Sequence, residues 1–229
     1  MKDEKKVLNQ FIRNVVAHRL SVVRDDGVYR HLRFQRPGTN SYYFDLVTWP
    51  GYLTVTGDMG TWTFSRIEDM FEFFTSKHFE RSESFLINPG YWSEKIEAGT
   101  HGGRDAICYE FDEDAFEKGL KEWLAAWRED KDEDDIESAE YVISSLVGEG
   151  FRDANIAVHA VYNNADWPRS VDTYDLAESI SYNLNTYSFH FLWICYAIVW
   201  GIERYRSSKL VDKATVTFLA FKHAQGGAA

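Results

Sequence analysis

Two short stretches hold the residue types that anion binding or acid–base chemistry requires. Gly99–Gly103 and the adjoining Arg104 combine the imidazole of His101, a guanidinium and flexible glycine amides, a set that could bind a phosphate-like anion. Asp58 lies between two glycines, where a rigid hairpin tip would present its carboxylate. Together Asp58, His101 and Arg104 could form a ligand loop for a nucleotide or another anion, or an enzyme site. The alternative is a surface loop at His101 and a plain turn at Asp58.

Asp45 is a third candidate, because apolar residues flank it within a predicted strand. Burial raises the pKa of a carboxyl group, which would suit Asp45 to act as a general acid or base. Buried charges are normally paired, however, and Arg30 and Arg33 lie on the preceding predicted strand. An ion pair with one of these arginines is therefore the alternative.

The sequence contains none of the strong catalytic, nucleotide-binding or metal-binding motifs. It has no paired CxxC, HExxH, GxSxG, GxxxxGK[ST] or GxGxxG pattern, and its seven histidines include no pair at i, i+3 or i, i+4. His190 lies in an apolar run and is expected to be a core histidine. We therefore expect no cofactor, no metal and no identifiable catalytic residue, and a protein that is more an interaction protein than an enzyme.

Negative charge is concentrated in one short segment of the chain. The net charge is -11, and residues 110–140 hold 14 acidic and four basic side chains, so this segment carries ten of the eleven charges. Direct duplex-DNA binding would need a cationic surface and is not expected, whereas a basic protein partner is. The alternative is a solvated face that confers solubility. The predicted partner-binding acidic face comprises Asp112, Glu113, Glu117, Glu122, Glu129, Asp130, Asp132, Glu133, Asp134 and Asp135.

These residues belong to a predicted α+β fold. Apolar residues recur at helical spacing over residues 4–18, and the period then changes to two, which indicates strands. Turn residues divide the second region into a five-stranded antiparallel meander with a Pro50-Gly51 type II turn. The predicted strands are Leu20–Arg24, Val28–Gln35, Ser41–Trp49, Tyr52–Thr56 and Thr61–Ser65.

The second half of the chain is predicted to be mainly helical. One helix is expected after an N-cap at Asp112 or Asp114, a second up to about Val147 and a third from Asp172. Residues 77–106 are irregular and could be a functional loop or a linker. The run Phe189–Arg206 is apolar on all sides and predicts a central helix that needs a sheet to cover it. Residues 215–221 indicate a final strand or the end of a helix. We expect a single domain, residues 1–229, with a subdivision into residues 1–76 and 77–229 as the alternative.

Composition and termini favour a folded protein of the cytoplasm. Aromatic residues make up 16% of the chain, and the two cysteines, Cys108 and Cys195, do not indicate a disulfide framework. The charged segment Met1–Lys6 does not resemble a signal peptide, and the 14-residue run Phe189–Ile202 is shorter than the roughly 20 residues that cross a bilayer. No membrane association is expected.

Two stretches resemble a family of small accessory proteins that temperate (lambdoid-type) phages and prophages of proteobacteria encode. They are Tyr43–Phe74, YFDLVTWPGYLTVTGDMGTWTFSRIEDMFEFF, and Phe189–Tyr205, FHFLWICYAIVWGIERY. The resemblance implies no catalytic residue, cofactor or substrate. It implies a genomic setting, because accessory phage genes often encode inhibitors of host defences such as CRISPR or restriction systems.

The expected function follows from this setting and from the acidic segment. We expect a phage or prophage accessory protein that binds a host protein stoichiometrically in the host cytoplasm, as an anti-defence inhibitor of the anti-CRISPR or anti-restriction type. Its partner would be a nucleic-acid-binding defence complex. The alternatives are a small-ligand or nucleotide-binding protein, or an enzyme, with a site at the meander loops, and a structural phage component. The sequence does not assign an oligomeric state.

Overall fold

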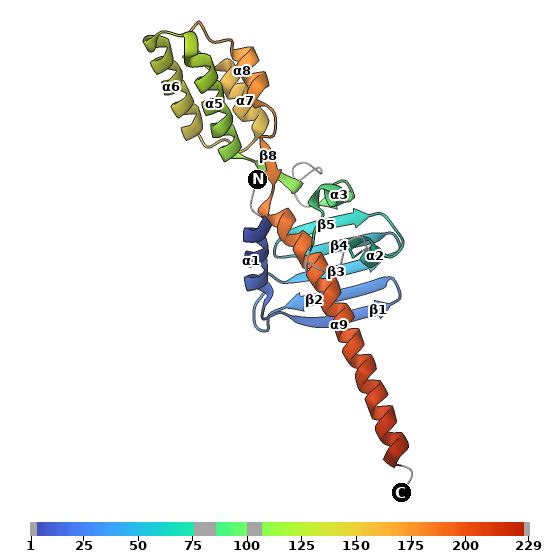
Figure 1. Ribbon diagram of the computed structural model, residues 1–229. Coiled ribbons are helices and arrows are strands. Elements are labelled where there is room, and N and C mark those ends of the chain that lie inside the picture. Colours follow the sequence, from blue (N-terminus) through green and yellow to red (C-terminus); the bar gives the residue numbers. More distant parts are fainter. Residues whose placement is uncertain (1–3, 76–85, 100–106, 227–229) are drawn as a thin grey trace. The chain divides into compact units, whose positions relative to one another are not determined.

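The chain folds into two compact units in a computed structural model that describes residues 4–75, 86–99 and 107–226 (Figure 1). The first, here called the sheet unit, combines the chain up to Cys108 with the chain from Phe189 onwards. The second, the helical unit, is Tyr109–Ser188. The predicted α+β fold is confirmed. The units do not divide at residue 76, because the last helix returns to the sheet.

The sheet unit is built on a six-stranded antiparallel meander in the order β1-β2-β3-β4-β5-β6. The five predicted strands are confirmed, and a sixth lies within the segment that the sequence indicated as irregular. Alternate residues such as Leu32, Phe34, Leu46, Leu53 and Val55 are buried, as the period of two requires. The strands are β1 (Arg19–Asp26), β2 (Tyr29–Gln35), β3 (Phe44–Trp49), β4 (Tyr52–Gly57), β5 (Gly60–Ser65) and β6 (Ile96–Gly99).

Helix α9 (Phe189–Gly226) lies across one face of this sheet (Figure 1). It packs closely on the sheet at Gly201, where a Cβ atom would lie 2.8 Å from Leu46 Cδ1 and 3.1 Å from Phe34 Cε2. Trp193 packs edge-on against Phe11 of α1 (Glu4–Val15), with ring centroids 5.1 Å apart. The predicted central helix is confirmed. The short helices α2 (Met70–Phe74) and α3 (Pro89–Ser93) also belong to this unit.

One expectation for α9 is wrong, and the structure decides between two alternatives for another part of the helix. His190 is exposed and is not a core histidine, because it lies in the first turn, where its ring meets that of Phe189 at 5.8 Å. Of the two alternatives for residues 215–221, the end of a helix is confirmed and a strand is wrong, because these residues belong to the last part of α9. No helix in the described ranges is both long and apolar enough to cross a membrane.

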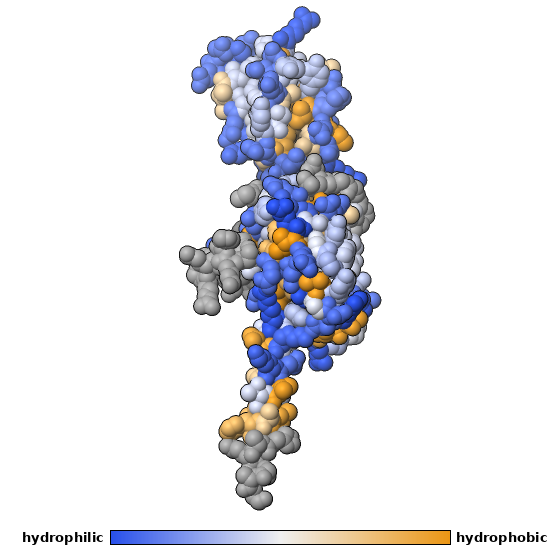
Figure 2. Space-filling view, turned by 90° about the vertical axis from the view of Figure 1, so that its right-hand side faces the viewer, coloured by the Kyte–Doolittle hydropathy of each residue, from blue (hydrophilic) through white to orange (hydrophobic). Residues whose placement is uncertain are grey.

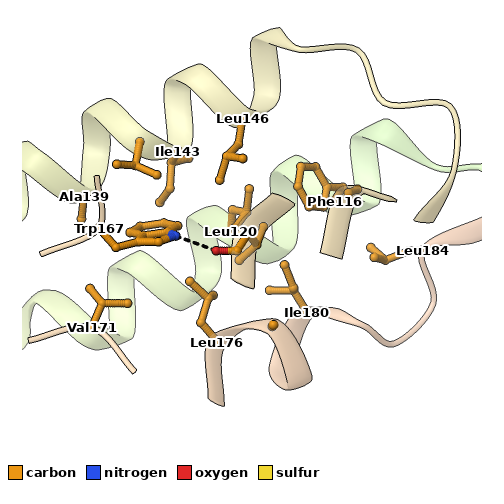
Figure 3. Close-up of a cluster of buried hydrophobic side chains, with 14 residues drawn as sticks. Phe116, Leu120, Ala139, Ile143, Leu146, Trp167, Val171, Leu176, Ile180 and Leu184 are labelled. Atoms are coloured by element: carbon orange, nitrogen blue, oxygen red, sulfur yellow. Dashed lines mark hydrogen bonds between the residues drawn. The ribbon is translucent and has the colours of Figure 1, made fainter. Parts of the chain in front are cut away.

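The helical unit has its own hydrophobic core (Figure 3). Trp167 lies among aliphatic side chains from the surrounding helices and donates a hydrogen bond from Nε1 to the Val161 carbonyl oxygen at 2.8 Å. Aspartates cap every α-helix of this unit, since each carboxylate accepts a bond from a backbone N–H of the first turn. The elements are β7 (Tyr109–Phe111), α5 (Glu113–Trp127), η1 (Arg128–Asp130), α6 (Glu133–Gly148), α7 (Ala154–Asn163), α8 (Thr173–Ile180) and β8 (Asn185–Tyr187), which pairs with β7.

Candidate functional site

The ten acidic residues proposed as one face are distributed along the helical unit. Asp112 and Glu113 lie at the start of α5, and the group Glu129–Asp135 follows its end. A 15-residue helix is about 22 Å long, so the two groups are separated by nearly the length of a small domain. The fold therefore divides the predicted face into smaller sets.

Three of the proposed acidic residues at α5 have partners within the fold. Asp112 is the N-cap and accepts a hydrogen bond from the Ala115 amide at 3.0 Å. Burial of Asp112 opposes its ionisation, but hydrogen bonds from backbone amides outweigh it and lower the pKa of this carboxyl group. Glu117 forms an ion pair with Lys121, and Glu122 lies 3.6 Å from Lys118. Asp112 thus has a local role, and the two lysines offset the charges of Glu117 and Glu122.

The dense acidic group is the connection between α5 and α6. We call residues 129–135 the acidic turn; it holds six carboxylates and Lys131. Asp132 caps α6 through the Asp135 amide at 2.9 Å, and Asp135 accepts a hydrogen bond from Ser170. Lys131 bonds to Asp130 at 2.7 Å and lowers the pKa of this carboxyl group, whose side chain is 79% exposed.

Three carboxylates of the acidic turn are uncommitted. Within the described ranges, the side chains of Glu129, Glu133 and Asp134 have no hydrogen-bond or ion-pair partner, and all three residues are exposed. Glu133 and Asp134 lie in the first turn of α6, where the helix dipole favours negative charge. Glu129 lies in η1, before α6 begins. The fold thus collects exposed negative charge at one end of the helical unit.

Asp58, a member of the proposed ligand loop, has a structural role. The Asp58 carboxylate accepts a hydrogen bond from the Tyr42 amide at 2.8 Å, and Tyr42 has a positive φ of 59°. The Asp58 amide in turn donates to the Tyr43 carbonyl oxygen at 3.0 Å. This side chain therefore holds the connection between β2 and β3. His101 and Arg104 lie outside the described residues.

Asp45 is a structural ion-pair residue. Its carboxylate receives two hydrogen bonds from Arg33, each 2.8 Å long, and one contact of 2.9 Å with His31 Nε2. Burial opposes ionisation of Asp45, but the bonds from Arg33 and His31 outweigh it and lower the pKa of the carboxyl group. The raised pKa needed for an acid–base role is absent, and the alternative of pairing with Arg33 is confirmed. Arg30 instead binds Asp69, with Nη–Oδ distances of 2.9 and 2.8 Å.

A groove between α7 and α8 was not foreseen from the sequence. It has a volume of about 520 Å³, within the range of small-ligand sites, and its walls include His159, Glu178 and the edge-to-face rings of Tyr162 and Tyr174, 6.4 Å apart. These four residues are exposed, so the groove is open to solvent along its length. The sequence did not predict this groove because its side chains come from two helices, and one of them, α7, lies in a stretch without a clear hydrophobic period.

Potential metal ligands do not gather in the described parts of the chain: no group of three or more His, Cys, Asp or Glu side chains could hold an ion there. Cys108 and Cys195 are both buried, and burial raises the pKa of Cys195 well above its ordinary value. Comparisons with protein-family models, curated proteins and solved structures found no match to this chain.

Proposed function

We propose that this protein acts by stoichiometric binding to a basic surface of another protein, through the acidic turn. The observation that carries the proposal is the concentration of six carboxylates within seven residues at one end of the helical unit. Three of these carboxylates have no partner among the described residues, so a partner protein could pair with them without first breaking an internal bond.

The physical role of such a surface is long-range attraction and orientation. Complementary charges raise the association rate and fix the register of two proteins, and the effect weakens as salt shortens the Debye length. Proteins that bind nucleic acid carry the required cationic surface, because phosphate neutralisation dominates their affinity. A nucleic-acid-binding protein is therefore the class of partner that fits the acidic turn best.

An inhibitory, anti-defence role is the form of binding that we propose. The support is the resemblance of Tyr43–Phe74 and Phe189–Tyr205 to accessory proteins of temperate phages and prophages. An inhibitor that occupies the nucleic-acid groove of a host CRISPR or restriction protein needs shape and negative charge, and it needs no chemistry of its own. The two carboxylates considered for chemistry, Asp45 and Asp58, both have structural partners.

Affinity purification from a host with active defence systems tests this proposal. The tagged protein is recovered at low and at high salt, partners are identified by mass spectrometry, and nucleic acid is measured by absorbance. We expect one host protein in a stoichiometric amount at low salt, a lower recovery at high salt, and no co-purified duplex DNA.

A matched pair of variants locates the binding surface. One carries Glu129→Lys, Asp130→Lys, Glu133→Lys and Asp134→Lys; Asp132 and Asp135 are kept because they bond within the fold. The control has the same change of charge on exposed residues of the sheet unit, through Glu68→Lys, Glu94→Lys, Glu97→Lys and Glu203→Lys. Recovery of the chain without any partner at either salt would contradict the proposal and favour the ligand-binding alternative.

A further inference from the structure

The C-terminal half of α9 projects from the sheet unit without any covering element. Its last side-chain contacts with the sheet unit are at Asp25, which accepts a hydrogen bond from Tyr205 at 2.7 Å and pairs with Lys209. Every residue from 209 to 222 is exposed. In the described part of the chain, no hydrogen bond, ion pair or ring contact joins residues 210–222 to another element.

This projecting segment carries an apolar stripe. At about 100° per residue, six residues fall within an arc of about 120°, the pattern of a helix that packs on one side. We call these residues the α9 stripe: Leu210, Val211, Ala214, Thr217, Phe218 and Phe221. Its four large apolar members are between 60% and 69% exposed. A shallow apolar groove runs along the same side of the helix, and hydrophobic residues are visible on the projecting end in Figure 2.

Local propensity does not account for a helix here. Val211 and the consecutive Thr215, Val216 and Thr217 are β-branched residues, which are weak helix formers. Helices in proteins gain most of their stability by packing an amphipathic face, and short helices alone in water are marginal. A packing partner for the α9 stripe would explain why this segment is helical.

We propose that the α9 stripe is the surface through which two copies of this chain associate. At roughly 60% exposure of side chains of about 150–200 Å² each, two stripes would bury on the order of 1,000 Å², about the area at which a specific interface begins. The same stripe on both copies makes a self-complementary two-fold interface. The small side chains of Ala214 and Thr217 at its centre let two helix axes approach to the usual 8–10 Å.

The charges beside the stripe favour a second copy over a membrane surface. Residues 210–222 contain Lys213 and Lys222 against Asp212, so no strong charge of one sign opposes the pairing of two identical helices. A helix that binds anionic lipid needs a strongly basic polar face, whereas this one has two lysines in a chain of net charge -11. Val216 and Leu219 also lie off the stripe and interrupt the polar side.

Sedimentation velocity over a roughly hundredfold range of protein concentration tests the proposal, since the fraction of paired chains rises with concentration. We expect the wild-type chain to reach twice its mass of 26.6 kDa as concentration rises. Phe218→Glu/Phe221→Glu removes two members of the stripe and is expected to stay at the mass of one chain.

The matched control is Val216→Glu/Leu219→Glu. These two residues are also exposed, at 67% and 49%, and have the same spacing, but they lie outside the stripe. We expect this variant to pair like the wild type, and circular dichroism checks that both variants are folded.

Three results would overturn the proposal. One is a wild-type chain that keeps the mass of a single chain at every concentration, whether it then binds vesicles of anionic lipid or another protein. The second is a dimer that neither variant dissociates, which would place the interface elsewhere. The third is a dimer that both variants dissociate equally, because the α9 stripe would then not be the specific surface.

Discussion

At the scale of single residues, Asp45 shows how the fold decides the role of a buried carboxylate. Its side chain is 7% exposed and is bonded to Arg33 and His31 on the neighbouring strand. The sequence indicated both an acid–base role and an ion pair, because a carboxylate among apolar residues fits either. Only the register of β2 against β3, which places Arg33 opposite Asp45, distinguishes them.

The loss of this carboxylate is expected to destabilise the sheet unit. Asp45→Asn should lower the free energy of unfolding by about 1–3 kcal/mol, the usual effect of removing one partner from a buried, charged hydrogen-bond network. Asp26→Asn is the control, because Asp26 is 76% exposed in its pair with Arg24 and exposed pairs contribute less than about 1 kcal/mol. Urea denaturation measures both, and equal effects of the two changes would contradict this account.

The dependence of the unfolding free energy on pH in acid should also change when Asp45 is replaced. The pKa of Asp45 is lowered from its ordinary 3.8, so its contribution is complete above pH 3.8 and is lost as the pH falls through the folded-state pKa. The pKa of Asp69 is lowered too, so the Asp45→Asn variant should still lose some stability as the pH falls. We expect Asp45→Asn to have a shallower decrease in unfolding free energy below pH 3.8 than the wild type. An unchanged slope would contradict a lowered pKa of Asp45 in the folded protein.

At the scale of elements, the contact of α9 with the sheet depends on Gly201. A side chain at this position would meet Leu46 and Phe34, both fully buried. Gly201→Leu is expected to destabilise the sheet unit by about 1–3 kcal/mol through overpacking. Gly148→Leu in α6 is the control, because no atom lies within 4 Å of a Cβ there. Denaturation of the two variants checks this, and a Gly201→Leu protein as stable as the control would contradict the close packing.

The sequence predicted those elements whose period is clear. The meander and α5 have periods of two and 3.6 that one buried face imposes, and both were found. Strand β6 was missed because it is four residues long and its partner β5 lies some thirty residues earlier in the chain. The full length of α9 was missed because residues 191–202 are largely buried without one polar face, and the second half of the helix is rich in β-branched residues.

The candidate site was predicted only in part, for a geometric reason. Acidic residues that are close in sequence were treated as one face, but residues at the two ends of α5 are far apart in space. The hydrogen bonds of Asp58 with the β2–β3 connection and the groove between α7 and α8 depend on tertiary contacts. The sequence shows that this segment is acidic, and the fold shows which of its exposed carboxylates lie together in the acidic turn.

At the scale of the whole molecule, the two units are expected to unfold in separate steps, because each has its own hydrophobic core. Differential scanning calorimetry should then show two transitions. Leu120→Ala removes a fully buried side chain of the helical unit, so it should lower the midpoint temperature of that unit's transition alone, with a loss of about 2–5 kcal/mol in the unit's stability. Gly201→Leu should lower the midpoint temperature of the other transition alone. A single transition that both changes shift would show that the units fold together.

The acidic turn is the part of the molecule on which the proposed function rests, and a binding titration tests it most directly. The dissociation constant of the partner identified by affinity purification is measured at two salt concentrations for the wild type, the acidic-turn variant and the sheet-unit charge control. We expect at least a tenfold weaker affinity at low salt for the acidic-turn variant, a loss of more than about 1.4 kcal/mol. The control should bind like the wild type. Equal affinities for both variants, whether both remain tight or both become weak, would contradict the assignment of binding to the acidic turn.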